Sequence, residues 1–216
     1  MEEKIGARIL EYFGSNMDSY LSSLLEHIIL SVLALLLACL IGISFGYLAI
    51  KNNKKERMIV TGFQVLRIIP SLAILILLIP IMGTGTEPAL IALVLLAVPP
   101  VLMNTITGLK EVPDFMLETA SGVGMTQRQV LWNVKFPLAL PLILTGIKTA
   151  FLEIIASATL ASKIGAGGLG DIIFTGLGLN RTDLLLIGGI SVAMLSVSGG
   201  LLLEVFDRVI LKYKYV

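Results

Sequence analysis

The chain has 216 residues, of which 56% are hydrophobic and 14% are charged, and its mean hydropathy is +0.94. A soluble domain carries about a quarter charged residues, so this composition excludes an ordinary soluble protein and indicates a membrane protein. The formal net charge of +1, without a polybasic or acidic tail, gives no support to nucleic-acid binding. The single cysteine, Cys39, excludes an intrachain disulfide, and the single histidine, His27, has no neighbour at metal-ligand spacing.

Five stretches of the chain are long and apolar enough to cross a membrane, which takes about 20 residues as a helix. Three of them contain no charged residue, and the other two contain one and two. The sequence therefore predicts an all-α polytopic membrane protein with five transmembrane helices. The predicted spans are residues 28–50, 58–82, 88–109, 138–162 and 184–203.

Residues 1–27 place apolar side chains such as Ile5 and Ile9 at helical spacing, and we expect an amphipathic helix along the outer interface. The first span, 28–50, is too long for a cleaved signal peptide and has no basic segment directly before it. We therefore expect it to remain as an anchor. The rest of the chain, 28–216, is expected to form one transmembrane domain.

Lysine and arginine predict the orientation, because they accumulate on the cytoplasmic side of membrane proteins. Five spans put the termini on opposite sides, and the basic residues are distributed unequally between them. The N-terminus is therefore expected outside and the C-terminus in the cytoplasm. The cytoplasmic set is Lys51, Lys54, Lys55, Arg57, Lys110, Arg128, Lys135, Arg208, Lys212 and Lys214, and the outer set is Lys4, Arg8, Lys163 and Arg181.

The prolines at positions 70, 80, 99 and 100 interrupt predicted spans. Proline removes a backbone hydrogen bond, so each position is expected to interrupt or kink its helix. Such kinks can accompany the opening and closing of a transporter, and they are also common in inert helical bundles. The pattern leaves both interpretations open.

The segment 110–137 is the longest one expected on the cytoplasmic side, and we call it the knob. Asp114 is a good N-cap for a first helix, and Gly124 supplies the left-handed conformation that ends it. Thr126 begins a second helix with capping-box spacing, and Pro137 marks the start of the next span. The pattern predicts two short helices about a glycine corner, and fits a docking element and a simple connection equally well.

The knob resembles the loop of sequence E-A-A, three residues, G, nine residues, I-x-L-P in the membrane subunits of binding-protein-dependent ABC importers. Glu118, Ala120, Gly124 and Pro137 stand at the matching positions with the matching spacing. The departures from the pattern are Thr119 for the first alanine, Val134 for the isoleucine and Phe136 for the leucine.

This resemblance implies that the knob carries the coupling helix, which sits in a cleft of a cytoplasmic ATPase. It also implies a fold like that of the methionine-permease-like importers and a location in the bacterial inner or plasma membrane. The implied partners are an ABC ATPase dimer, a second permease subunit, identical or different, and an extracytoplasmic substrate-binding protein. ATP and magnesium would bind to the ATPase, since this chain has no G-x-x-x-x-G-K-[ST] loop. We therefore expect a transport subunit that is not itself an enzyme and binds no cofactor.

The stretches 67–85, 103–112 and 158–179 resemble the branch of this family that imports glycine betaine, carnitine or choline as osmoprotectants. The segment GAGGLG also occurs in permeases for methionine and other small solutes, which leaves such a permease as the alternative. Aromatic residues are only 6% of the chain, and the spans show no aromatic box for a quaternary ammonium. This is consistent with an importer whose selectivity lies in a separate or fused binding protein.

Three charged residues inside the spans are functional candidates, because an unpaired charge in the membrane is costly. Lys148 is near enough to the cytoplasmic face for its side chain to snorkel, which favours a structural role. Glu153 lies deeper, and we expect it to line the solute path or to pair with Arg67. Lys148 and Glu153 differ by about 140° around a helix, so they are not expected to pair with each other.

The stretch IGAGGLGDI has the G-x-G-x-x-G spacing of a dinucleotide-binding turn in Gly165, Gly167 and Gly170. That motif requires a preceding strand, whereas this stretch follows a predicted transmembrane helix on the outer side. We therefore reject the nucleotide interpretation. The glycines, Gly168 included, either let two copies of the chain approach at an outer gate or form a flexible turn.

Two other classes of protein fit parts of this pattern. A secondary transporter or channel driven by an ion gradient would use the intramembrane charges for coupling, although no inverted repeat is visible. A scaffold protein would use the knob to bind a soluble partner without transport. For the favoured importer, the candidate residues of the translocation path or gate are Arg67, Pro70, Ser71, Asn104, Glu153, Gly165, Gly167, Gly168 and Gly170.

Overall fold

The computed structural model describes residues 2–51 and 53–211, which are almost entirely helical. No strand occurs among them, so the predicted all-α class is confirmed. Lys212 and Lys214, which the orientation rule counted, lie outside the described residues, as do the side chains of Lys4 and Lys55. In chain order the elements are α1 (Glu2–Ala49), α2 (Asn53–Ile68), α3 (Ser71–Met82), α4 (Thr86–Lys110), α5 (Asp114–Gly122), α6 (Gln127–Val130), the π-helical turn η1 (Leu131–Lys135), α7 (Phe136–Ala161), the 3-10 turn η2 (Ser162–Ile164), α8 (Leu169–Gly178) and α9 (Thr182–Ile210).

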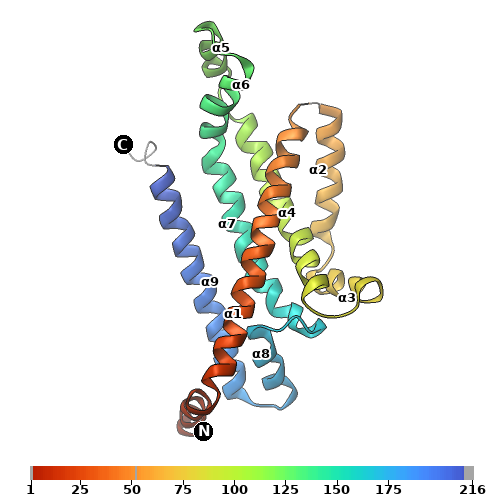
Figure 1. Ribbon diagram of the computed structural model, residues 1–216, viewed down its shortest axis with the longest axis vertical. Helices are drawn as coiled ribbons and strands as arrows, with labels where there is room; N and C mark the ends of the chain where they lie inside the picture. Colours follow the sequence, from red (N-terminus) through yellow and green to blue (C-terminus); the bar gives the residue numbers. More distant parts are fainter. Residues whose placement is uncertain (1, 52, 212–216) are drawn as a thin grey trace.

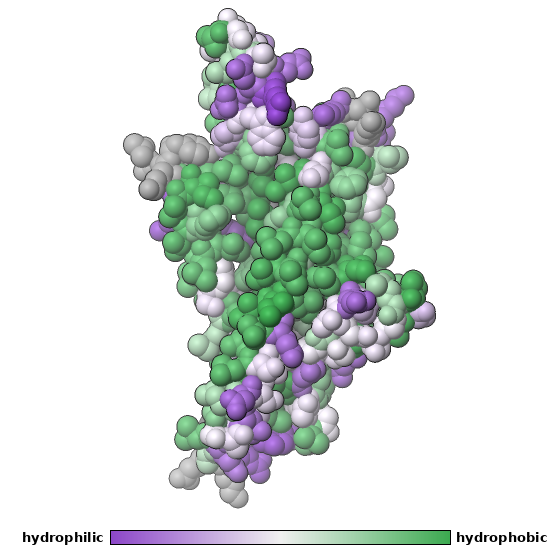
Figure 2. All heavy atoms as spheres, viewed as in Figure 1, coloured by the Kyte–Doolittle hydropathy of each residue, from purple (hydrophilic) through white to green (hydrophobic). Residues whose placement is uncertain are grey.

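The helices form an elongated bundle whose two ends differ (Figure 1). One end carries α5, α6 and the turn between α1 and α2, and we call it the knob end. The other carries α8 and the first turns of α1, and we call it the α8 end. On the face drawn in Figure 2, hydrophobic side chains cover the middle of the bundle and hydrophilic side chains gather towards both ends, the pattern of a protein that crosses a bilayer.

Four helical stretches are long and apolar enough to cross a membrane within the described residues: α1, α4, α9 and the stretch Gln127–Ile164 that contains α7. A fifth crossing requires α2 and α3 to be counted as one span, and these two helices meet at 97°. The predicted span 58–82 is therefore a broken helix, divided at Pro70 as proline chemistry favours. The other three prolines, at positions 80, 99 and 100, lie within helices that continue through them.

Helix α1 does not begin a new element at residue 28, where the sequence suggested that an interfacial segment gives way to a span. It runs on to Ala49, and its one departure from helical geometry is at Asn16, with φ −127° and ψ 22°. The Asn16 amide donates to Tyr12 O at 3.4 Å, and Ser15 Oγ donates to Glu11 O at 2.7 Å. Side-chain bonds of this kind compete with the backbone bonds of the helix and can bend it. Residues 17–41 contain neither glycine nor proline, which is consistent with the continuous helix past residue 28.

Small residues let the central helices approach closely. Helix α4 is the most buried of the long helices and packs between α1 and α7. At the crossings, a glycine of one helix faces the backbone or Cβ of the next, as transmembrane packing favours. The pairs are Gly42 with Val101, Gly46 with Thr105, Gly108 with Ala139, and Gly146 with Pro100 and Asn104.

Adding one methyl group at Gly146 is expected to destabilise the bundle by about 1–3 kcal/mol, because the core has no room for it. A Cβ at this position would lie 2.7 Å from the Asn104 Cβ and 2.8 Å from the Pro100 carbonyl oxygen. The matched control is Gly200→Ala in α9, where nothing lies within 4 Å of the new Cβ. Unfolding by SDS, followed by circular dichroism, measures both variants, and equal losses would contradict this packing.

Candidate functional site

The knob folds as its sequence predicts in its first half. Helix α5 begins at Asp114, with Pro113 as the preceding cap residue, so Asp114 occupies the first turn and not the cap itself. Gly124 has φ +87° and ends the helix, and the Met125 N–H donates to Ala120 O at 3.1 Å across the corner. Ala120 is buried, whereas Glu118 is exposed beside it. Glu118, Ala120 and Gly124 of the coupling pattern therefore lie in one compact corner.

The second half of the knob differs from the expected short helix. The capping box of Thr126 and Gln129 is present, which confirms the predicted start. The helix then continues without interruption through η1 into α7. Pro137 has no N–H and its ring would clash with the Asn133 carbonyl in a regular α-helix, so a π-helical turn accommodates it. The Phe136 N–H accordingly donates to Leu131 O, and the knob is rigidly joined to a transmembrane helix.

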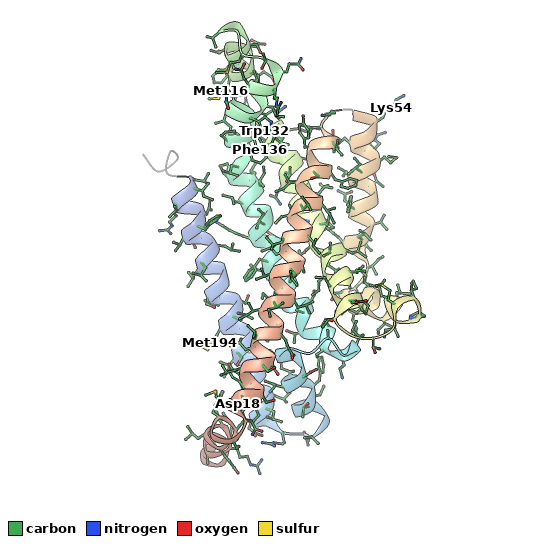
Figure 3. The ribbon with its side chains drawn as sticks, in the orientation of Figure 1. Asp18, Lys54, Met116, Trp132, Phe136 and Met194 are labelled. Atoms are coloured by element: carbon green, nitrogen blue, oxygen red, sulfur yellow. The ribbon has the colours of Figure 1, made fainter. Side chains whose placement is uncertain are left out.

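The projecting knob exposes apolar side chains at the end of the bundle where Figure 2 shows mostly hydrophilic ones. Phe115 is 64% exposed, Val123 is 72% exposed and Trp132 is 56% exposed. Trp132 lies at the base of the knob (Figure 3), where a cavity of about 800 Å³ separates the knob from Tyr47 and Lys51 at the end of α1. Exposed apolar groups of this kind mark a surface that another protein can cover.

Replacing Gly124 with alanine is expected to loosen the knob by about 1–2 kcal/mol, because a side chain disfavours the left-handed conformation. Nothing lies within 4 Å of the new Cβ, so the effect is backbone strain alone. Tryptic cleavage at Arg128 should become about 5–30-fold faster. Gly122→Ala, within α5 and also in open space, is the control and should not accelerate cleavage. Similar rates in both variants would contradict the proposed role of the corner.

A second candidate site lies at the break between α2 and α3. Arg67 in the last turn of α2 and Glu153 of α7 form an ion pair with 3.8 Å between Nη2 and Oε1. The pairing that the sequence suggested is thus confirmed. Both side chains border an open cavity of about 360 Å³. The other residues that line it are Ile68, Ile69, Pro70, Ser71, Leu96, Ala156 and Ser157.

The remaining candidates of the translocation path lie elsewhere. Asn104 lies at the contact of α4 with α7, where its amide donates to Pro100 O at 2.9 Å. The glycine turn before α8 packs against α1 of its own chain: the Gly168 N–H donates to Glu26 Oε2 at 3.0 Å. Partial burial and the nearby Glu26 carboxylate raise the pKa of Asp171 in α8. The structure therefore brings together the α2–α3 candidates and Glu153, but not Asn104 or the glycines.

The turn itself supports the rejection of a nucleotide site. It follows α7 and η2, and not a strand, as the sequence indicated. Gly165 and Gly167 have positive φ values of 80° and 75°, which only a flexible residue adopts readily. A Cβ on Gly170 would lie 2.1 Å from Thr159 O, so the close approach in this structure is made within one chain.

Sequence reasoning missed the partner of Lys148. Instead of snorkelling alone, its ammonium forms an ion pair with Asp207 in the last turns of α9. Asp207 lay beyond the last predicted span, which ended at residue 203, so it was not considered as an intramembrane charge. The signal that could have identified it is a carboxylate close to the end of the last long apolar stretch, where Glu204 and Asp207 follow residue 203, at the depth of an unpaired lysine.

A bundle of apolar helices with a projecting apolar knob and a charged cavity at a broken helix defines a membrane transport protein. Residues 38–212 match the family of binding-protein-dependent transport system inner membrane components, and the chain belongs to this family. It is therefore a membrane subunit of an ABC transport system and a multi-pass inner-membrane protein.

Relatives and solved structures extend this result over nearly the whole chain. The carnitine transport permease protein OpuCB of Listeria monocytogenes is 40% identical over 188 residues, 87% of this chain and 86% of the relative. The glycine betaine/carnitine/choline transport system permease protein OpuCB of Bacillus subtilis is 38% identical over 202 residues, 93% of each chain. An inward-facing structure of the MetNI methionine ABC transporter matches with a TM-score of 0.76 at 22% identity, covering 90% of this chain and 97% of that chain. This last similarity confirms the fold.

Proposed function

We propose that this chain and a second permease subunit form the translocation path of an ATP-driven importer for a quaternary-amine osmoprotectant such as glycine betaine, carnitine or choline. The observation that carries the proposal is the identity of 38–40% to permeases named for carnitine and for glycine betaine, carnitine and choline. This identity covers the transmembrane helices and the knob together. ATP would then be hydrolysed by a partner subunit that binds ATP and magnesium.

The knob is the proposed contact with that ATPase. Its apolar side chains Phe115 and Val123 are largely exposed, and a partner would remove them from water. Because α6, η1 and α7 form one continuous helical stretch, a displacement of the knob reaches the transmembrane region directly. Closure of an ATPase dimer on the knob would therefore tilt α7 and the residues that α7 contributes to the path.

The Arg67–Glu153 pair supports a second permease subunit. Arg67 lies at the break inside the span that α2 and α3 form together, and Glu153 lies about 12 Å from the end of α7 at Ala161, so both charges lie within membrane-spanning stretches. The Arg67 side chain is 52% exposed and the Glu153 side chain 37% exposed. Half-exposed charges at this depth cannot face lipid without a large cost, so a water-filled path or another subunit should cover them.

We place the knob end in the cytoplasm and the α8 end outside, following the distribution of basic residues. A binding protein would then deliver solute at the α8 end. Residues 1–27 would belong to this outer region, and residues 28–216 would form the transmembrane domain proper. Alternating access follows when the ATPases close, the bundle opens outward, and hydrolysis resets it.

The experiment that tests the proposal is affinity purification of the tagged chain from native membranes, with identification of what copurifies. We expect an ABC ATPase and a permease subunit in the complex. Reconstituted with a binding protein, the complex should take up a quaternary amine only when ATP is supplied inside the vesicles. Uptake of methionine and not of quaternary amines would assign another solute, and ATP-independent uptake driven by an ion gradient would overturn the importer mechanism.

A further inference from the structure

The ion pair at the break between α2 and α3 is loose. The distance of 3.8 Å between Arg67 Nη2 and Glu153 Oε1 is longer than a hydrogen bond, and both groups border the open cavity of about 360 Å³. A structural ion pair inside a membrane is normally close and hydrogen-bonded, because its partners otherwise remain poorly compensated. The cavity thus presents two opposite charges that a small solute could separate.

The start of α3 adds a positive end to the arginine side of this cavity. Helix α3 has 12 residues, and no described side chain caps its first turn, where Pro70 and Ser71 line the cavity. The first N–H groups of a helix lack intrahelical partners and carry the positive end of the helix dipole. Arg67 precedes this turn by only a few residues. The arginine and the helix start together form a position for an anionic group, a use that broken membrane helices favour.

The opposite side of the cavity favours a cation. Glu153 of α7 supplies a carboxylate there. None of the nine residues that line this cavity is aromatic, so a quaternary ammonium would be held by charge and not by aromatic rings. The volume lies at the lower end of the range for small-molecule sites, about 300–1,000 Å³.

We propose that this cavity is a weak binding site for a zwitterion, with Arg67 and the start of α3 holding the carboxylate and Glu153 holding the ammonium. This inference rests on the proposed function and names the solute chemistry that the path itself recognises. A zwitterion that enters between the two side chains gives each of them a new opposite charge. The net charge of the site stays at zero, so the solute replaces the ion pair without leaving a buried charge alone.

The same arrangement discriminates against a solute that carries only the cationic group. Choline in this cavity would pair with Glu153 and leave Arg67 without its partner, at a cost for the uncompensated guanidinium. Glycine betaine would compensate both. The path should therefore favour a zwitterion over a cation of similar size, independently of the binding protein that delivers them.

The test is saturation-transfer NMR of the methyl protons of glycine betaine and of choline, with the assembled permease and ATPase in nanodiscs and no binding protein. For the wild type we expect saturable binding of glycine betaine. Arg67→Gln should weaken glycine betaine binding by about tenfold or more relative to choline, since a charge-assisted bond is lost. Glu153→Gln should weaken both ligands. Arg57→Gln, an exposed arginine on the same helix, is the matched control and should change neither.

The exchanged variant Arg67→Glu with Glu153→Arg separates recognition from folding. It restores an ion pair but places a carboxylate beside the start of α3, so it should assemble with the ATPase and still fail to bind glycine betaine. Wild-type-like binding by this variant, or an unchanged ligand ratio in Arg67→Gln, would overturn the zwitterion site. Absence of saturable glycine betaine binding in the wild type would overturn it too. A complex that imports quaternary amines normally in these cases would leave the proposed function standing.

Discussion

Replacing Glu118 with arginine is expected to detach the ATPase from the permease while the permease stays folded. Glu118 is exposed on α5, between the apolar side chain of Phe115 and the corner at Gly124. Reversing a charge on a docking surface places it against partner groups that complement the original charge, and this lowers the affinity by several kcal/mol. We expect copurification of the ATPase and coupled ATP hydrolysis to fall by more than about tenfold. The measurement is the ATPase-to-permease ratio after affinity purification.

The control for this variant is Asp18→Arg, which makes the same reversal on α1 at the opposite end of the bundle (Figure 3). It tests whether an added positive charge impairs insertion or assembly in general. Exposed substitutions away from special features change stability by no more than about 0.5 kcal/mol, so both permeases should unfold like the wild type. Retention of the ATPase by Glu118→Arg, or its loss from both variants, would contradict docking through the knob.

Replacing Lys148 with leucine is expected to destabilise the bundle by about 3–5 kcal/mol. The loss leaves the Asp207 carboxylate, which is only 13% exposed, without its partner. Asp207 Oδ1 is already buried without a hydrogen bond among the described residues, so the loss of Lys148 removes the ion pair without another bond there to compensate it. The ion pair joins α9 to α7 near the knob end. Helix α9 is the least buried of the long helices and packs mainly against α8, so this ion pair is a direct link between its C-terminal part and α7.

The double variant Lys148→Leu with Asp207→Leu distinguishes an unpaired charge from lost packing. Replacement of both partners of a buried ion pair by apolar residues is often neutral, so we expect stability within about 1 kcal/mol of the wild type. Unfolding by SDS of the two single variants and the double variant gives the coupling energy. Additive losses would show that the two side chains contribute separately and would contradict this ion pair.

Several local features of this protein could be predicted because short-range chemistry controls them. The corner of the knob depends on Gly124, whose left-handed conformation few other residues adopt, and on the capping box of Thr126 with Gln129. The break near Pro70 follows from a residue that cannot donate a backbone hydrogen bond. Each of these signals lies within a few residues of the feature that it determines.

Other features depend on a balance between competing interactions, which a sequence pattern does not settle. The continuity of α1 past residue 27 and its bend at Asn16 depend on competing side-chain bonds whose balance composition does not reveal. The π-helical turn before Pro137 joins the knob to α7, where the sequence indicated a separate short helix. The prolines at positions 99 and 100 leave α4 continuous, because close packing with α1 and α7 holds that helix in place.

By itself the sequence determined the class of fold, the membrane location, the coupling pattern and the chemistry of the charged residues. These depend on composition, periodicity and short motifs, each of which is contained within its own stretch of the sequence. Only the tertiary structure decided that Lys148 pairs with Asp207, that Arg67 and Glu153 share one cavity, and that the glycine turn rests on α1. Lys148 and Asp207 lie 59 residues apart in the sequence, and Glu26 and Gly168 lie 142 residues apart. Helix packing alone sets which side chains meet across such separations.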